Sequence, residues 1–176
     1  TDTCRELIER IAASAGNCEG VFTSCQMGGV VVTDISGAAV TNYLSWRDQR
    51  TLGDSGDGDR YLSHVEKLST DEDWRAIGRE LKPGGATALL YWLAKSGVLP
   101  PSASVAMGLG DYVLSRLCNA PARAHATAAL GMVDLNTGDW RRGWFSRLGF
   151  GHLDWPELTE FDRPLGSIRF EGRPIP

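Results

Sequence analysis

The sequence predicts an α/β fold in which helices flank a mixed sheet, because short β-branched runs alternate along the chain with segments of helical periodicity. The clearest β-branched run is the valine triplet at 30–32. The clearest helical segment lies at 86–95, where Leu89, Leu90 and Leu93 recur at helical spacing. The 176 residues, of which 42% are hydrophobic, suffice for a single domain with one core.

The first quarter of the chain predicts one helix followed by strands. Thr3 and Glu6 have the spacing of a capping box, and apolar residues then repeat on one helical face until Gly16 ends the helix. Short connections favour adjacent pairing of the strands that follow. We therefore expect neighbouring strands at the centre of the sheet, at residues 20–24, 29–33 and 38–46.

Residues 47–59 predict a helix start followed by an exposed loop. The segment 53–59 holds three glycines and three aspartates in seven residues and shows no apolar period. Such a composition buries too little apolar surface to offset the entropy cost of ordering, so we expect this loop to be mobile. Its acids lack the spacing of a calcium loop, and no metal site is expected.

Helices and strands alternate again beyond this loop. Pro83 and the two glycines that follow it break the chain, and Ser96 with Gly97 ends the next helix. The predicted helices lie at 61–68, 73–81, 86–95, 110–117 and 139–148, and the predicted strands lie at 104–107, 131–135 and 166–170.

Charge and composition exclude several classes of function. The net charge is −4, with 18 basic residues scattered among 22 acidic ones, so no nucleic-acid partner is expected. No apolar run approaches the roughly 20 residues that span a bilayer, and no signal peptide is visible, so we expect a cytoplasmic protein without membrane contact. The four cysteines form no C-x-x-C pair and are interpreted as small buried side chains in a reducing compartment. The local motifs of serine hydrolases, zinc proteases and Walker-type nucleotide binding are absent from the sequence, so no catalytic residue is predicted.

Gln26, Met27 and two glycines stand where two predicted strands meet. One interpretation is a turn and nothing more, since glycine accepts the backbone angles of tight turns. The other is that a small molecule lies against bare backbone here, because a residue without a side chain lets a ligand approach closely. The local residues alone leave both interpretations open.

The order of four stretches resembles the FGGY carbohydrate kinase family, whose members are two-domain sugar and polyol kinases related to actin and hexokinase. The stretches are "SCQMGGVVVTDISG", "LSWRDQRT", "GLGDYVLSRLCNAPA" and "GMVDLNTGDWRRGWFSRLGF", and together with their spacing they cover roughly residues 5 to 170. The resemblance implies a ribonuclease-H-like domain of the actin and hexokinase ATPase type, similar to that of xylulokinases and sedoheptulokinases.

The resemblance also implies a sugar pocket floored by the turn at 26–28. The substrate-binding residues that it implies are Gln26, Met27, the Gly28 backbone, Trp46 and Asp111. Asp111 has a structural alternative, since it could instead cap the helix that follows it.

Four further side chains near these stretches are interpreted as structural. Asp48 and Arg50 are expected to pair with each other and hold a helix start rather than contact a sugar. Trp92 and Trp140 fit helical periodicity, and we expect them in the core.

The chain departs from the family pattern at several points. Gly28 replaces the histidine that usually follows the Met, and the family's Thr-Asp-x-x-x-Ala-Ser segment falls at 123–131, where His125 and Thr127 are the polar substitutes. The family's phosphate-binding hairpin and its general-base aspartate are expected outside residues 1–176. We therefore expect 1–176 to be a single, incomplete, sugar-side N-terminal domain. It would bind no cofactor itself, whereas the full-length parent would bind ATP and Mg²⁺.

The predicted function is part of an ATP-dependent carbohydrate kinase that phosphorylates a hydroxyl of a ketose or polyol. Phosphoryl transfer needs a phosphate cradle and a base, and none is visible between residues 1 and 176, so this chain alone is expected to be inactive. The expected partners are a sugar or polyol and a C-terminal kinase domain, and a homodimer is left open. Two alternatives remain: a degenerate, non-catalytic sugar-binding or regulatory module of the same fold, and an unrelated α/β structural domain.

Overall fold

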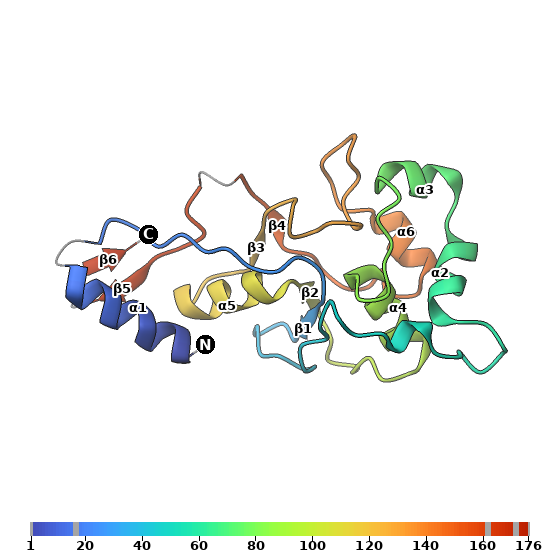
Figure 1. The fold of residues 1–176 in the computed structure, drawn as a ribbon, viewed down its shortest axis with the longest axis horizontal. Coiled ribbons are helices and arrows are strands. Elements are labelled where there is room, and N and C mark those ends of the chain that lie inside the picture. The colour runs from blue at the N-terminus through green and yellow to red at the C-terminus, as the bar shows by residue number, and fades with distance from the viewer. Residues whose placement is uncertain (1, 16–17, 161–162, 171–172, 176) are drawn as a thin grey trace.

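A computed structural model of the chain describes residues 2–15, 18–160, 163–170 and 173–175 (Figure 1). Helices and short strands alternate along it, so the predicted α/β class is confirmed. None of the described helices is long and apolar enough to cross a membrane. The helices are α1 (Asp2–Ala15), the 3₁₀ turn η1 (Arg50–Leu52), α2 (Tyr61–Leu68), α3 (Asp71–Ala76), α4 (Ala86–Lys95), α5 (Leu109–Cys118) and α6 (Arg142–Arg147). The strands are β1 (Val31–Thr33), β2 (Val105–Met107), β3 (Arg123–Ala124), β4 (Glu157–Leu158), β5 (Ile168–Phe170) and β6 (Arg173–Ile175).

The described strands form separate pairs, so the prediction of one mixed sheet is wrong. Strands β1 and β2 pair antiparallel with Val32 opposite Ala106, β3 and β4 pair parallel, and β5 and β6 pair antiparallel. Isolated bridges extend the first pair on both sides. Leu44 and Ala39 form antiparallel bridges with Val30 and Thr33, and Asp154 forms a parallel bridge with Val105 of β2. The described strands therefore form three two-stranded sheets and no continuous central sheet.

Two of the three central strands expected from the sequence are also wrong. Residues 20–24 are extended, but Val21 to Ser24 make no hydrogen bond with another described residue, so no ladder forms. Residues 38–46 form no continuous strand. They join the valine segment through single bridges and through the Val40 N–H, which donates to the Val32 carbonyl at 2.9 Å, whereas the Val32 N–H donates to the Thr41 hydroxyl at 3.1 Å instead of to a backbone carbonyl. The central valine strand is correct in place, and the side chains of 30–32 are buried.

Other differences from the prediction arise at glycines. The helix expected at 73–81 ends at Ala76, because Gly78 and Arg79 adopt φ of 61° and 59°. The strand expected at 131–135 is reduced to one bridge between Val133 and Trp140. Gly131 explains this, since its φ is 74° and a Cβ there would meet the Glu80 carbonyl oxygen at 2.2 Å.

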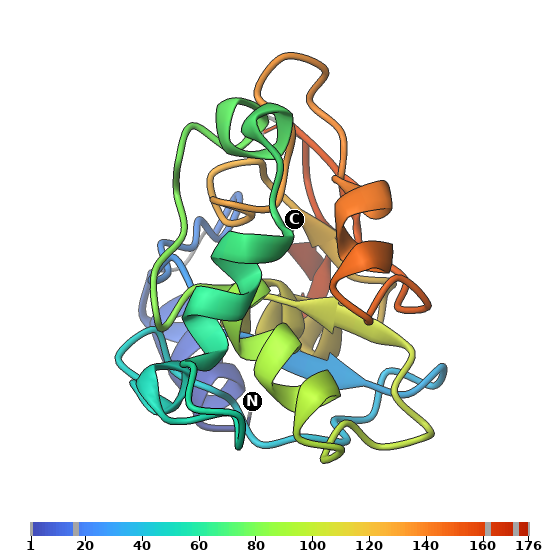
Figure 2. The same ribbon diagram turned by 90° about the vertical axis from the view of Figure 1, so that its right-hand side faces the viewer.

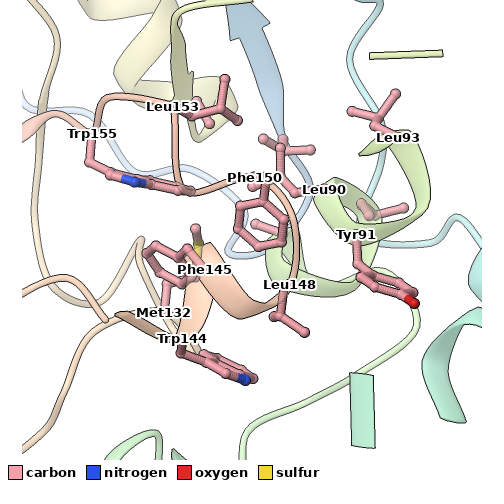
Figure 3. Close-up of a cluster of buried hydrophobic side chains, with 14 of the residues drawn as sticks. Leu90, Tyr91, Leu93, Met132, Trp144, Phe145, Leu148, Phe150, Leu153 and Trp155 are labelled. Atoms are coloured by element: carbon pink, nitrogen blue, oxygen red, sulfur yellow. The ribbon is translucent and has the colours of Figure 1, made fainter. Parts of the chain in front are cut away.

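The core lies around α4 and α6, at one end of the long axis in Figure 1, and this end faces the viewer in Figure 2. Helix α4 is buried on most of its circumference, and the aromatic side chains of α6 and the segment after it fill the space beside it (Figure 3). Phe145 stands at the centre, with ring centroids 5.4 Å from Phe150 and 4.6 Å from Trp155. Trp92 and Trp140 pack against this core, as predicted.

The acidic loop at 53–59 is organised by its own hydrogen bonds. Asp54 Oδ1 accepts the N–H groups of Gly56 and Gly58 at 2.8 and 3.1 Å, and the Ser55 N–H donates to the Asp59 carbonyl at 2.8 Å. These bonds were not expected from the sequence, and the mobility of the loop stays a prediction. Ligand-type atoms of Asp57, Asp59 and His64 lie within 4.8 Å of one another, but the Lys67 ammonium already neutralises Asp59.

Candidate functional site

A groove of about 960 Å³ runs between the extended segment 19–28, helix α5 and the segment 163–168. In Figure 1 the first of these segments passes along α5. The contact is close at Gly110, where a Cβ would meet the Cys25 Sγ at 2.6 Å. Glycine at this position therefore lets the two walls of the groove approach each other.

Four of the five predicted substrate-binding residues line this groove: Gln26, Met27, Gly28 and Asp111. Trp46 does not line it, but its indole Nε1–H donates to Gln26 Oε1 at 2.9 Å. The fold therefore brings together residues from two segments that are far apart in the sequence. His125 and Thr127 also line the groove, and their Nδ1 and Oγ1 atoms lie 2.8 Å apart.

The lining of the groove combines apolar and polar groups. Apolar walls are provided by Ile8 of α1, Leu114 of α5, and Leu165 and Ile168 near the C-terminus. A sugar or polyol presents C–H faces and hydroxyls together, and a lining of this mixed kind suits both. A second cavity of about 10 Å³ lies beside Asp111, but it is no larger than one water molecule, so the groove is the candidate site.

The glycines of the turn pack against the protein itself. Gly28 and Gly29 have φ of 79° and 75°, and a Cβ on Gly29 would meet the Leu44 carbonyl oxygen at 2.6 Å. The Gly29 N–H donates to the Gly84 carbonyl at 3.0 Å, which joins this turn to the start of α4. Turn formation thus accounts for Gly29, whereas Gly28 both turns the chain and lines the groove.

The sequence did not indicate Tyr43, which lies against this turn. Its hydroxyl accepts a hydrogen bond from Gln26 Nε2 and donates one to the Gly28 carbonyl at 3.4 Å. The signal that could have found it was the predicted pairing of 29–33 with 38–46, which places Tyr43 opposite the turn.

Asp111 both caps α5 and lines the groove, and its binding of a substrate stays a prediction. Its Oδ2 accepts the Gly108 N–H at 3.2 Å, which caps the first turn of α5, and the side chain also lines the groove. Asp111 is only 9% exposed. Burial raises the pKa of Asp111 to about 6, although the Gly108 hydrogen bond acts in the opposite direction. Side chains in clefts whose pKa is strongly shifted are concentrated at functional sites.

Asp48 and Arg50 take the structural role that was expected of them. Asp48 Oδ1 accepts the Arg50 backbone N–H at 3.0 Å and the Arg50 Nε–H at 2.9 Å. The Arg50 guanidinium also lies over the Trp92 ring at 4.5 Å from its centroid. Neither residue lines the groove.

Replacing Asp111 by Asn is expected to stabilise the chain. With its pKa raised from 3.8 to about 6, the folded state holds the proton more tightly than the unfolded state, so stability falls as the pH rises through this range. Asn avoids that penalty and can still accept the Gly108 N–H. Urea denaturation should therefore show a free energy of unfolding about 1–3 kcal/mol higher than wild type at pH 7, and little difference near pH 4.

The matched control for this measurement is Asp139→Asn, because Asp139 is exposed and does not line the groove. This variant should match wild type at both pH values. A less stable Asp111→Asn chain at pH 7 would show that the Asp111 charge is well compensated.

Comparison with solved structures gives clear matches, whereas no family model and no curated protein matches the sequence. A xylulose kinase from Brucella ovis matches with a TM-score of 0.74 and 20% identity, over 94% of this chain and 34% of that one. A gluconate kinase from Lactobacillus acidophilus gives 0.73 and 18%, over 90% and 32%. A glycerol kinase from Plasmodium falciparum gives 0.67 and 18%, over 95% and 36%. The chain thus spans about a third of the length of these kinases and has the same fold as that third, which confirms the resemblance to carbohydrate kinases at the level of the fold.

Proposed function

We propose that this chain, which shares its fold with sugar and polyol kinases, is the sugar-side part of an ATP-dependent kinase that phosphorylates a hydroxyl of a ketose or polyol. The observation that carries the proposal is the meeting of Gln26, Met27, Gly28 and Asp111 in one groove. These residues belong to two of the stretches that resemble carbohydrate kinases, and a shared groove is what a common ligand requires.

The residues of the groove suit a polyhydroxylated ligand. The Asp111 carboxylate can accept hydrogen bonds from hydroxyls, since among the described residues its hydrogen-bond partner is the Gly108 N–H alone. The Gly28 backbone lets a hydroxyl approach without a side chain between. Met27 is 54% exposed at the rim, where it can cover the C–H side of a sugar ring.

The described residues do not fit the phosphates of ATP with Mg²⁺. The first turn of α5 is already capped by the Asp111 carboxylate, whose charge repels a phosphate. At the start of α4, Gly84 packs on Trp46 and the Thr87 hydroxyl donates to the Gly131 carbonyl at 3.0 Å. We therefore assign ATP and Mg²⁺ to other polypeptide of the parent protein, and no step of phosphoryl transfer to residues of this chain.

Isothermal titration of the chain with a panel of ketoses, aldoses and polyols tests the proposal. At least one ketose or polyol should bind weakly, with a dissociation constant of roughly 1 mM, because one open groove buries only part of a small ligand. Met27→Ala should weaken that binding. Leu135→Ala, which changes an equally apolar but distant and 66% exposed side chain, should not.

A coupled assay for ADP on the same panel tests the assignment of catalysis. The chain alone should show no sugar-dependent turnover, since residues 2–15, 18–160, 163–170 and 173–175 offer neither a phosphate cradle nor an assigned base. Turnover would contradict the assignment, and Asp48→Asn and Asp111→Asn would then identify the base. Absence of sugar binding across the whole panel would overturn the proposed function.

The degenerate, non-catalytic module remains the second candidate, because Gly28 stands where the family usually has a histidine that binds substrate. The same titration combined with an assay of the full-length gene product separates the two. Sugar binding without activity in the full-length product would favour the non-catalytic module.

A further inference from the structure

The side-chain amide of Gln26 is held at both of its ends. Its Oε1 accepts the Trp46 indole N–H at 2.9 Å, and its Nε2 donates to the Tyr43 hydroxyl. Tyr43 passes its own hydroxyl hydrogen to the Gly28 carbonyl at 3.4 Å. Three side chains and one backbone carbonyl thus form a single chain of hydrogen bonds beside the groove.

The direction of this chain is fixed by the chemistry of its end groups. An indole N–H can only donate, so Gln26 must turn its oxygen toward Trp46. A carbonyl can only accept, so the Tyr43 hydroxyl must donate to Gly28 and accept from Gln26. Rotating the Gln26 amide by half a turn would place two donors face to face at Trp46, and this orientation is therefore excluded.

The fixed amide keeps two hydrogen-bonding positions for a ligand. One of its two amide hydrogens and one carbonyl lone pair have no partner among the described residues. Both belong to the same planar amide group, and Gln26 lines the groove. Two adjacent oxygens of a sugar match them, one accepting from Nε2 and the other donating a hydroxyl hydrogen to Oε1.

We infer that Tyr43 and Trp46 are positioning residues that orient Gln26 to bind two neighbouring oxygens of the substrate, as in a vicinal diol or an α-hydroxyketone. This inference rests on the proposed function for the identity of the ligand. Its physical basis is preorganisation, since an amide whose rotation is already restricted loses less entropy on binding. The role given to Trp46 is orientation of Gln26 rather than stacking on a sugar face.

The first arm of the test needs no sugar. In NMR spectra of the ¹⁵N-labelled chain, Tyr43→Phe and Trp46→Phe should each release the Gln26 amide, whose hydrogens should exchange with water about fivefold faster than in wild type, in line with the loss of one hydrogen bond. Tyr112→Phe removes a hydroxyl from a half-buried tyrosine of α5 whose hydroxyl forms no hydrogen bond with the described residues, and should leave that exchange unchanged.

The second arm measures affinity for the sugar that the wild-type chain binds best. Tyr43→Phe and Trp46→Phe should each weaken binding about fivefold to tenfold, and Tyr112→Phe should not. A double-mutant cycle then separates positioning from general stability. Once Gln26→Ala is present, adding Tyr43→Phe should cost no further affinity, because the role proposed for Tyr43 is to orient Gln26.

The possible results distinguish the positioning role of Tyr43 and Trp46 from the binding of substrate oxygens by Gln26. Unchanged Gln26 exchange in both variants, or additive losses in the double-mutant cycle, would overturn the positioning role. Faster exchange with unchanged affinity would overturn the binding of substrate oxygens by Gln26 and leave the proposed function standing. If wild type binds no sugar, the proposed function fails together with the ligand assignment, while the exchange measurement still decides whether Tyr43 and Trp46 orient Gln26.

Discussion

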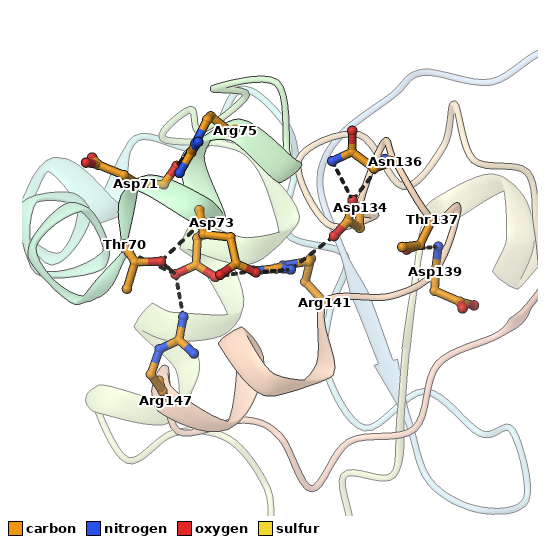
Figure 4. A network of polar contacts seen from close by, with 11 residues as sticks. Thr70, Asp71, Asp73, Arg75, Asp134, Asn136, Thr137, Asp139, Arg141 and Arg147 are labelled. Atoms are coloured by element: carbon orange, nitrogen blue, oxygen red, sulfur yellow. Dashed lines mark hydrogen bonds and ion pairs between the residues drawn. The ribbon is translucent and has the colours of Figure 1, made fainter.

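Replacing Asp73 by Asn is expected to destabilise the chain by about 2–4 kcal/mol at pH 7, because it removes the buried carboxylate that accepts hydrogen bonds from Arg141 and Arg147. Asp73 has no exposed surface and joins α3 to the start and end of α6 (Figure 4). Its Oδ1 accepts from Arg141 at 2.6 Å, and its Oδ2 accepts from Arg147 and from the Thr70 N–H and hydroxyl. An amide at this position would direct its NH₂ group at one of these donors.

The same carboxylate makes the stability of the chain depend on pH in acid. Burial favours its protonated form, but the hydrogen bonds from Thr70, Arg141 and Arg147 outweigh burial and lower the pKa of Asp73 to about 2. Its contribution to stability is therefore complete above the unfolded-state pKa near 4 and is lost as the pH falls toward about 2.

Urea denaturation between pH 7 and pH 2 measures both effects. The free energy of unfolding of wild type should fall across the acid range, whereas that of Asp73→Asn should fall less. Asp71→Asn is the control, since Asp71 is exposed in the same turn of α3 and should change stability by less than about 0.5 kcal/mol. An Asp73→Asn chain as stable as this control would show that the ion pairs contribute nothing net.

Replacing Phe145 by Ala is expected to lower the free energy of unfolding by about 3–5 kcal/mol relative to wild type, because buried apolar surface is lost and a cavity remains. Phe145 is fully buried, and its ring contacts those of Trp144, Phe150 and Trp155, with centroid distances of 4.6–6.1 Å. Rings this close on three sides cannot all collapse into the vacated space.

Denaturant midpoints of Phe145→Ala and of Ile35→Ala provide the comparison. Ile35 is 86% exposed in a turn, so its truncation should be nearly neutral. Equal midpoints for the two variants would contradict the placement of the core around α6.

The helices could be predicted from the sequence better than the strands. The bounds of α2 and α4 were predicted correctly, because local signals set them: loop glycines precede α2, and Gly85 and Gly97 flank α4. The strands depend on partners far along the chain. Residues 20–24 have strand-like composition but find no partner among the described residues, and 131–135 is bent by Gly131. Amino-acid composition alone does not show that the first segment lacks a partner or that the second is bent.

The part of the candidate site whose residues the resemblance named could be predicted from the sequence. The part that depends on side-chain contacts in the folded chain could not. Gln26, Met27, Gly28 and Asp111 do meet in one groove, yet Trp46 contacts Gln26 instead of lining it. The predicted pairing of 29–33 with 38–46 could place Tyr43 opposite the turn, but its contact with Gln26, a side chain 17 residues earlier, is visible only in the folded chain. The elevated pKa of Asp111 likewise follows from burial that only the folded chain creates.

The central claim is that the groove beside the 26–28 turn binds a sugar or polyol. An NMR titration of the isotopically labelled chain with ketoses and polyols tests it most directly, because the shifts report where the ligand binds. We expect saturable shifts at the Met27 methyl group, the Gly28 amide and the Gln26 side chain, with much smaller ones at the acidic loop around Asp57. Saturable shifts confined to that loop, or no saturable shift with any ligand, would contradict it.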